Sequence, residues 1–435
     1  MTPLAVPALS DAGTVLCIVC ILLVPCSGAG LALINTGLGR SRSAAHSMLA
    51  SLCVVAVAGL VYFACGFAWQ GYLGRPAHLV SISGKAWGWI AAEPLFFRGL
   101  KLDGSPASLA AWLQMLSVGL AALIPLGSGA DRWRLPAACA STALLAGFTY
   151  PLFAHWVWGG GWLAQLGIHY RLGRGFVDAG GSASIQSVGG LTALSIAWIL
   201  GPRLGKYSRE GIPTAIPGHN AVLVLLGCVL ALVGWLGLNS AGAILFAGIA
   251  PTAAVLIGVN TVLSASVAAL AALMITRMRF GKPDASLVAN GWVSGLVASS
   301  AACPWVTPAA ALFVGLVAGV VVTFSIELFE VHLKVDDPGG AISVHAVAGI
   351  WGVLALGFFA YFPQPVSGQW VAQVVGAATL LGFVLPLTYG LNWLLDRFLP
   401  QRAPVEGERL GMDVHELGAT AYPEFVIHTE DFLPR

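Results

Sequence analysis

Gln186 and His345 occupy matching places in two similar stretches of the sequence, 178–191 and 337–350, which lie 159 residues apart. Six of the fourteen aligned positions are identical, including an aspartate at the start of each stretch. A neutral imidazole donates through one ring nitrogen and accepts through the other, whereas an amide forms hydrogen bonds without ionising. One polar residue in the middle of each copy of a repeated apolar segment indicates a central permeation site of a membrane transporter.

The composition is that of a polytopic membrane protein. Hydrophobic residues make up 57% of the 435-residue chain, charged residues make up 9%, and the mean hydropathy is +0.84. So few charges cannot cover a soluble globule of this length. Because about 20 apolar residues cross the hydrocarbon core, we expect eleven spans, at 13–37, 46–70, 108–127, 135–157, 181–202, 217–240, 246–276, 284–302, 307–331, 341–361 and 370–396.

Lys and Arg are distributed unequally between the loops on the two sides of these spans. Fifteen lie on one side and six on the other, four of the six in the 71–107 loop. Because cytoplasmic loops carry the excess of positive charge, we expect a multi-pass protein of the cell (inner) membrane. Its amino terminus would lie outside and its carboxyl terminus in the cytoplasm, which requires an odd number of spans.

The two similar stretches enter the membrane from opposite sides. Asp178 precedes a span that begins outside, and Asp337 precedes one that begins inside. The repeat is therefore inverted, and an inverted repeat places equivalent residues symmetrically about the membrane midplane. Gln186 and His345 each lie roughly two turns into a helix, so we expect them to meet near the centre.

The repeat also defines the predicted organisation of the chain. We expect an all-α membrane fold in which residues 13–202 and 217–361 form two five-helix halves and 370–396 forms an extra helix. Residues 1–402 would make up the transmembrane domain. Residues 403–435 are polar and contain Pro and Gly, which predicts a cytoplasmic tail with little structure of its own.

Several other kinds of chemistry have no signal in the sequence. The net charge is +2 and the basic residues form no continuous patch, so we expect no nucleic-acid partner. Cys17 and Cys20 form a C-x-x-C within an apolar span and without a second pair, which favours helix packing. No metal-ligand cluster, nucleophilic triad or phosphate-binding loop is evident, and we expect neither enzymatic activity nor a metal or cofactor.

Ordered motifs spread over nearly the whole chain resemble the ammonium transporter family, which includes the methylammonium permeases and Rhesus proteins. This resemblance implies eleven helices per subunit, a homotrimer, and one narrow hydrophobic pore per subunit that carries ammonium or ammonia across the lipid bilayer. The motifs are His155-Trp156-Val-Trp158-Gly-Gly-Gly161-Trp162, Phe176-Val-Asp178, Gly201-Pro-Arg203, Gly218-His219-Asn220, Gly234-Trp235-Leu-Gly237-Leu-Asn239, Val335-Asp336-Asp337-Pro and Val344-His345-Ala-Val-Ala-Gly349.

The chain departs from the family at the pore constriction. The resemblance implies a pair of pore histidines, of which His345 is the second, but Gln186 stands at the position of the first. Because glutamine does not ionise, a direct proton relay between the side chains is interrupted, and a proton path needs water or is absent. A bare ammonium ion in an apolar pore costs on the order of 10 kcal/mol or more without compensation. Gln186 has a working role in the pore or marks a loss of transport, and the alternative for His345 is a hydrogen-bonded structural residue.

The resemblance also assigns residues to an outer ion-recruitment site. Trp158 matches a tryptophan that faces the incoming cation, where a ring face contributes about 0.5–2 kcal/mol; an interfacial belt residue is the alternative. Asp178 matches an aspartate that supports this site, and a helix N-cap is the alternative. Gly242 stands where the family has a serine that helps to receive the ion, and Ser240 is close enough in sequence to replace it.

The two gate positions lack their aromatic side chains. Ser117 and Leu238 stand where the resemblance implies an outer and an inner gating phenylalanine. We therefore expect a wider or looser pore mouth and weaker selectivity for ammonium.

Transport of ammonium or ammonia is the leading functional hypothesis. The main alternative is a sensor that binds ammonium without moving it and signals through a cytoplasmic partner, and a further alternative is a channel for another small neutral solute. The segment 411–422 is similar to the family's tail, which couples neighbouring subunits, but Leu417 and Ala419 depart from its pattern. Binding of a cytoplasmic nitrogen-regulatory protein is accordingly left open.

Overall fold

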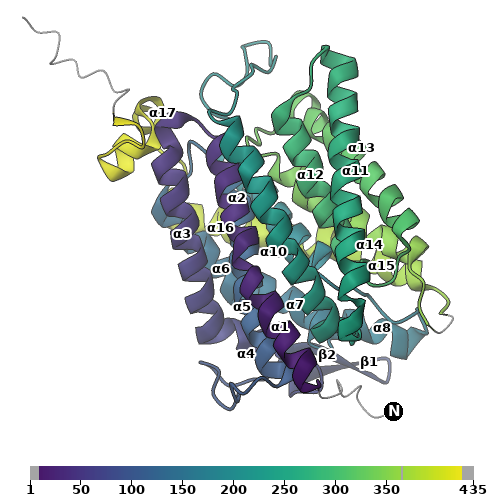
Figure 1. The fold of residues 1–435 in the computed structure, drawn as a ribbon. Helices are drawn as coiled ribbons and strands as arrows, with labels where there is room; N and C mark the ends of the chain where they lie inside the picture. The colour runs from purple at the N-terminus through teal and green to yellow at the C-terminus, as the bar shows by residue number, and fades with distance from the viewer. Residues whose placement is uncertain (1–8, 364–365, 424–435) are drawn as a thin grey trace, which may run out of the picture.

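Apolar helices run through the molecule in alternating directions in the computed structural model, which describes residues 9–363 and 366–423 (Figure 1). The helices of the first half are α1 (Asp11–Leu23), α2 (Pro25–Leu38), α3 (Ala44–Val61), α4 (Phe67–Gln70), α5 (Pro106–Gly129), α6 (Leu135–Leu144), α7 (Tyr150–Trp158), α8 (Trp162–Tyr170) and α9 (Val188–Leu200). Those that follow are α10 (Ala221–Ala247), α11 (Ala254–Phe280), α12 (Ala285–Ser300), α13 (Pro308–Glu327), α14 (Ala348–Phe359), α15 (Gln369–Thr379), α16 (Leu385–Phe398) and α17 (Val405–Leu410).

Short helical segments of other pitch join or extend these helices. Two are single 3₁₀ turns, η1 (Ser41–Ser43) and η5 (Pro251–Ala253). The others are π-helical: η2 (Tyr62–Gly66), η3 (Leu145–Thr149), η4 (Ser182–Ser187), η6 (Leu328–His332), η7 (Ile342–Val347), η8 (Leu380–Val384) and η9 (Asp413–Leu417). Wide π turns occur often at functional sites.

Each of the eleven predicted spans contains a helix, but α10 runs seven residues beyond the span predicted at 217–240, so the span predicted at 246–276 begins at the end of α10 rather than in α11. Ten helical segments in the described part of the chain are long and apolar enough to cross a membrane. The remaining span, predicted at 284–302, is α12, which has 16 residues and a length of about 24 Å at the usual helical rise. Pro125 lies inside α5, which continues to Gly129. The all-α membrane fold is therefore confirmed.

A β-hairpin that the sequence analysis did not anticipate lies in the long loop between α4 and α5. Strands β1 (Ala77–Ile82) and β2 (Lys85–Ala91) pair antiparallel. The two residues between them, Ser83 and Gly84, have φ values of 52° and 74°, as the tightest hairpin turns require. We call the end of the bundle that carries this hairpin the hairpin face, and the opposite end, which carries α17, the tail face (Figure 1).

The tail is more ordered than predicted. In its described part, 403–423, α17 and η9 form two short helical segments against the tail face. The order comes from carboxylates that bind backbone N–H groups of the bundle, which a polar composition does not reveal. The rest of the predicted tail, 424–435, lies outside the described residues.

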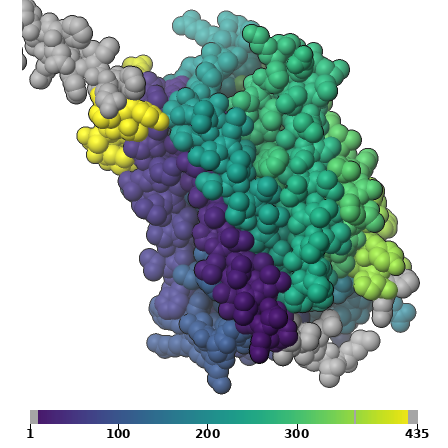
Figure 2. Space-filling view, viewed as in Figure 1, coloured from purple at the N-terminus to yellow at the C-terminus, as the bar shows by residue number. Residues whose placement is uncertain are grey.

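The outer wall of the bundle is apolar. Helices α1, α10 and α11 form one wall in the space-filling view, with the tail at its edge (Figure 2). Large apolar side chains on this wall are exposed, among them Val15, Leu22, Val222, Val255 and Leu270. A soluble protein does not expose so many large apolar residues over one surface, so lipid is the expected solvent of this wall.

Candidate functional site

Gln186 and His345 contact each other inside the bundle. The amide oxygen Oε1 of Gln186 lies 2.7 Å from Nδ1 of His345. Gln186 is completely buried and His345 is 4% exposed. Gln186 belongs to η4, which leads into α9, and His345 belongs to η7, which leads into α14. The two side chains that the repeat predicted to meet are within hydrogen-bond distance.

Matching backbone features start the helices that carry the pair. Gly181 and Gly340, equivalent in the repeat, have φ values of +97° and +66°, a conformation that L side chains rarely adopt. Each turns the chain from a loop into a π-helical segment, and the N–H of Gln186 donates to the carbonyl of Gly181 at 3.0 Å, five residues back. The wide turn places one side chain of each segment toward the other.

Two further equivalent glycines let the helices approach closely. A Cβ on Gly190 would overlap the backbone nitrogen of Ala346, and a Cβ on Gly349 would overlap the carbonyl of Ser182. Small residues at a crossing allow membrane helices to pack backbone against backbone. The short distance between Gln186 and His345 therefore depends on glycine in both repeats.

Asp178 and Asp337 cap these helices. The carboxylate of Asp178 accepts from the N–H groups of Gly181, Ala183 and Ser184 at 3.0, 3.0 and 2.8 Å. Asp337 accepts from Ala341 and Ile342 at 3.1 and 2.8 Å. A carboxylate at a helix start satisfies donors that have no partner within the helix. The capping alternative considered for Asp178 therefore describes its contacts.

Several buried polar atoms near the pair have no partner within the described residues. They are Nε2 of Gln186 and the hydroxyls of Ser184 and Ser343, which are equivalent in the repeat. Buried polar groups are nearly always hydrogen-bonded to protein or to water. The unpartnered amide nitrogen of Gln186, beside the imidazole of His345, gives the centre of the bundle the means to bind a small polar molecule.

Trp158 is held by a hydrogen bond and covered by an aromatic ring. Its Nε1 donates to the carbonyl of Asp178 at 2.7 Å. Phe246, at the end of α10, stacks on the indole with ring centroids 4.6 Å apart and an interplanar angle of 16°. Sequence reasoning missed Phe246, because the two residues are distant in the chain and no periodicity links them. One face of the predicted recruitment ring is thus occupied by protein.

The positions predicted to receive the ion lie on α10. Ser240 is 6% exposed and lies beside Cys20 of α1. A Cβ on Gly242 would lie 2.5 Å from the carbonyl oxygen of Ala179, in the segment that precedes η4. A serine at Gly242 would force this segment away, so glycine is the residue that the local packing allows.

The gate positions contain no aromatic ring of their own. Ser117 is completely buried, and its hydroxyl donates to the carbonyl of Leu113 in the same helix at 2.8 Å. Leu238 is 1% exposed. A residue that the sequence analysis overlooked, Tyr150 of α7, donates to Oε1 of Gln114. A buried tyrosine hydroxyl bonded to a buried amide adds polarity close to Ser117.

Buried ion pairs join the two halves at the tail face. Arg203, after α9, contacts Asp336, before η7, at 2.9 Å and Asp131, after α5, at 3.0 Å. Burial raises the pKa of Asp336, but the charge of Arg132 and the hydrogen bonds of Arg203 outweigh it and hold this pKa below its usual value. The loop that follows α9 is therefore linked to the loops that follow α5 and precede η7.

Carboxylates of the tail bind the starts of two membrane helices. Asp413 accepts from the N–H groups of Ala45 and His46 at the start of α3, at 3.2 and 2.7 Å. Glu416 accepts from the N–H of Leu135 at the start of α6 and contacts Nε2 of His46, both at 2.9 Å. Negative groups are favoured at helix N-termini, and this explains why the tail docks on this face.

The chain resembles known proteins over nearly its whole length. Residues 15–422 match the model of a family described as the Ammonium Transporter Family. Ammonium transporter Amt2 of Archaeoglobus fulgidus is 36% identical over 96% of this chain and 89% of that protein. The ammonium transporter of Bacillus subtilis is 30% identical over 94% of this chain and 98% of that protein.

Solved structures agree with this relationship. A structure described as a sensor Amt protein superposes with a TM-score of 0.83 at 28% identity, covering 93% of this chain and 98% of that one. Mep2 of Candida albicans superposes with a TM-score of 0.80 at 22% identity, covering 96% of this chain and 93% of that one. Mep2 therefore shares the fold of this chain. The chain belongs to the ammonium transporter family.

Proposed function

We propose that this protein is an ammonium transporter that conducts neutral ammonia past Gln186 and His345 with little accompanying charge. The observation that carries the proposal is the 2.7 Å contact between Oε1 of Gln186 and Nδ1 of His345. A carbonyl oxygen only accepts hydrogen bonds, so Nδ1 of His345 is the donor. The lone pair of His345 then lies on Nε2.

This arrangement suits a molecule that both donates and accepts. The unpartnered Nε2 of Gln186 offers N–H groups to the lone pair of ammonia, and Nε2 of His345 accepts one of its hydrogens. An ammonium ion has hydrogens but no lone pair, so the amide N–H groups repel it. Together with the cost of bringing an ion into an apolar interior, this favours the neutral molecule.

Charge transfer is limited by the amide. A proton released at the outer mouth would have to cross the constriction separately from ammonia. Two imidazoles can pass a proton by changing tautomer, but the amide of Gln186 does not ionise at physiological pH. The side chains alone therefore provide no continuous path for the proton.

The outer site is proposed to recruit the cation weakly. This site would be formed by Trp158, Asp178, Ser240 and Gly242. Asp178 would act indirectly: its carboxylate caps the following backbone, and its carbonyl accepts a hydrogen bond from Nε1 of Trp158. Phe246 covers one face of Trp158, so a cation would have to use the other face or displace the phenyl ring. We assign Ser117 and Leu238, both buried, to the gate region.

The family and the loop charges support a proposal for location and assembly. We propose a homotrimer in the cell (inner) membrane, with the tail face in the cytoplasm. The loops of the tail face contain Arg40, Arg132, Arg203 and Lys334, in keeping with the excess of positive charge on the cytoplasmic side. Residues 1–402 would form the transmembrane domain and residues 403–435 the tail, where a nitrogen-regulatory protein would bind. Crosslinking in native membranes would show a trimer ladder.

Reconstituted protein tests the transport proposal. Vesicles that contain the purified chain would be given an ammonium gradient, with internal pH and membrane current recorded in parallel. We expect alkalinisation by entering ammonia that is faster than in empty vesicles, with a small current or none. The absence of both signals would contradict conduction.

Sensing is a second candidate function. The observation that favours it is the 28% identity and TM-score of 0.83 with a protein described as a sensor Amt protein. In this case ammonium would bind on the hairpin face and change how the tail docks on the opposite face. Saturable ammonium binding together with altered proteolysis of the tail, and without flux in vesicles, would support this function over transport.

A further inference from the structure

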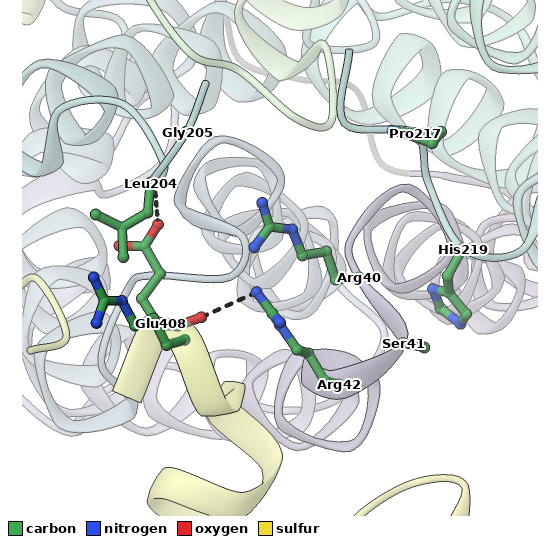
Figure 3. A pocket seen from close by; sticks show the side chains of 9 residues that line it. Arg40, Ser41, Arg42, Leu204, Gly205, Pro217, His219 and Glu408 are labelled. Atoms are coloured by element: carbon green, nitrogen blue, oxygen red, sulfur yellow. Dashed lines mark hydrogen bonds between the residues drawn. The ribbon is translucent and has the colours of Figure 1, made fainter. Parts of the chain in front are cut away.

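A pocket of about 750 Å³ lies on the tail face, and no residue of η4 or η7 lines it. Its walls come from three parts of the chain: the turn between α2 and α3, the loop between α9 and α10, and α17 of the tail. Its volume is in the range of pockets that hold small organic ligands. Figure 3 shows Arg40 and Arg42 between Glu408 on one side and His219 on the other.

The pocket has an excess of positive charge. Arg40, Arg42 and Arg409 line it, and among the described residues that line it Glu408 is the only carboxylate. Glu408 is already engaged, because its oxygens accept from the N–H of Leu204 and from Arg402. It therefore neutralises little of the charge of the three guanidinium groups that line the pocket.

The guanidinium groups retain donors for a ligand. Arg42 donates from Nη2 to the carbonyl of Glu408 at 3.3 Å. The nearest carboxylate oxygen to the Arg40 side chain, on Asp131, is 3.9 Å away and is shared with Arg203 at 3.0 Å. Burial lowers the pKa of Arg40, and the charge of Asp131 works in the opposite direction. Each guanidinium carries five N–H donors, so most of those on Arg40 and Arg42 are available.

We propose that this pocket binds a phosphate-bearing anion whose oxygens bridge Arg40 and Arg42 of the α2–α3 turn to Arg409 of α17. Arginine binds phosphate through paired hydrogen bonds, and groups from separate segments can surround its tetrahedral oxygens. Because Arg409 belongs to the tail, such an anion would hold the tail against the bundle.

The phosphate could belong to a soluble ester or to a lipid headgroup. The pocket lies where α2 ends and α3 begins, so it is near the surface at which anionic headgroups concentrate. It is also open to solvent and has room for the organic part of a soluble ligand. The two sources share the same phosphate chemistry, and the composition of the membrane separates them.

Pyrophosphate titration tests the site directly. The full chain would be purified in a neutral detergent at low salt and titrated with pyrophosphate by calorimetry. We expect saturable binding that weakens about tenfold or more in Arg42→Gln and in Arg409→Gln, and that weakens with added salt. Arg277→Gln, an exposed arginine at the tail-face end of α11, is the matched control and should bind like the native chain.

A second readout addresses the tail, and nanodiscs address the source of the phosphate. Pyrophosphate should slow cleavage of the tail by proteinase K in the native chain but not in Arg409→Gln. Weaker pyrophosphate binding in phosphatidylglycerol nanodiscs than in phosphatidylcholine nanodiscs would identify a lipid headgroup as the ligand, and equal binding would identify a soluble one. The proposal is overturned if native protein in phosphatidylcholine nanodiscs shows no saturable binding, or if the pocket variants and Arg277→Gln bind equally.

Discussion

The side chains of Gln186 and His345 meet across two helices that run through the bundle in opposite directions. The contact of 2.7 Å joins residues 159 positions apart, the same offset that separates the two copies of the repeat. An amide therefore occupies the place that symmetry would give to a second imidazole. This substitution keeps the hydrogen bond at the centre of the site but removes one of two ionisable groups.

Loss of the Asp178 cap should destabilise the helix formed by η4 and α9. Asp178→Ala removes the acceptor of three buried N–H groups, at a cost of about 1–3 kcal/mol. We expect a lower melting temperature in detergent and slower ammonia flux. Asp178→Asn retains one acceptor oxygen, so its melting temperature and flux should lie between those of Asp178→Ala and those of the native chain. Equal melting temperatures for the alanine variant and the native chain would show that the cap has no role in stability.

The close contact between Gly190 of α9 and Ala346 of η7 should tolerate no side chain at position 190. Gly190→Val would place carbon atoms against the backbone of Ala346, pushing α9 and η7 apart, so we predict loss of flux and a clear loss of stability. The control is Gly390→Ala in α16, where a Cβ meets nothing within 4 Å. This change should raise stability by about 0.5–1 kcal/mol and leave flux unchanged. Native flux in Gly190→Val would contradict the proposed packing.

Removing the ring over Trp158 should strengthen cation recruitment. Phe246→Ala exposes the covered face of the indole, and a cation over that face gains about 0.5–2 kcal/mol. We expect the ammonium concentration for half-maximal flux to fall several-fold. Phe246→Leu keeps an apolar side chain over the indole and should lower the half-maximal ammonium concentration less. An unchanged or higher half-maximal concentration in Phe246→Ala would show that Phe246 does not restrict access to the ring.

Docking of the tail should be lost in acid. Burial raises the pKa of Glu416, but its hydrogen bonds to His46 and the N–H of Leu135 and the charge of Arg134 outweigh this and lower the pKa. A carboxyl whose pKa is lowered by docking stabilises the docked state fully above its free pKa of about 4.3. That contribution disappears as the pH falls through the lowered value.

Limited proteolysis as a function of pH measures this effect. The tail of the native chain should be protected at pH 7 and should become sensitive to an acid-active protease below about pH 4. Glu416→Gln keeps an acceptor oxygen without the charge, so its tail should be cleaved faster than the native tail at pH 7, with a smaller further increase in acid. Identical pH profiles would rule out Glu416 as the titrating group.

The sequence was informative where the structure repeats itself. The apolar lengths predicted the spans, and the alignment of Asp178 with Asp337 predicted both the opposite directions of α9 and α14 and the contact between Gln186 and His345. These predictions rest on symmetry and on the thickness of a bilayer. Both constrain the chain without knowledge of how individual side chains pack.

The features that sequence reasoning missed depend on pairs of residues with no shared pattern. Phe246 reaches Trp158 from another helix, and Asp413 reaches the start of α3 from the far end of the chain. The β-hairpin was missed because a short Ser-Gly turn within a long loop gives a weak signal beside eleven apolar spans. Such contacts are decided by tertiary packing.

In the proposed mechanism, the amide of Gln186 interrupts proton transfer while ammonia still passes. The most direct test compares membrane current and ammonia flux for the native chain and Gln186→His in the same vesicles, with His345 unchanged in both. We predict similar ammonia flux in both proteins, and an ammonium-driven current in Gln186→His that is small or absent in the native chain. Equal currents in the two proteins would show that the amide of Gln186 does not interrupt proton transfer.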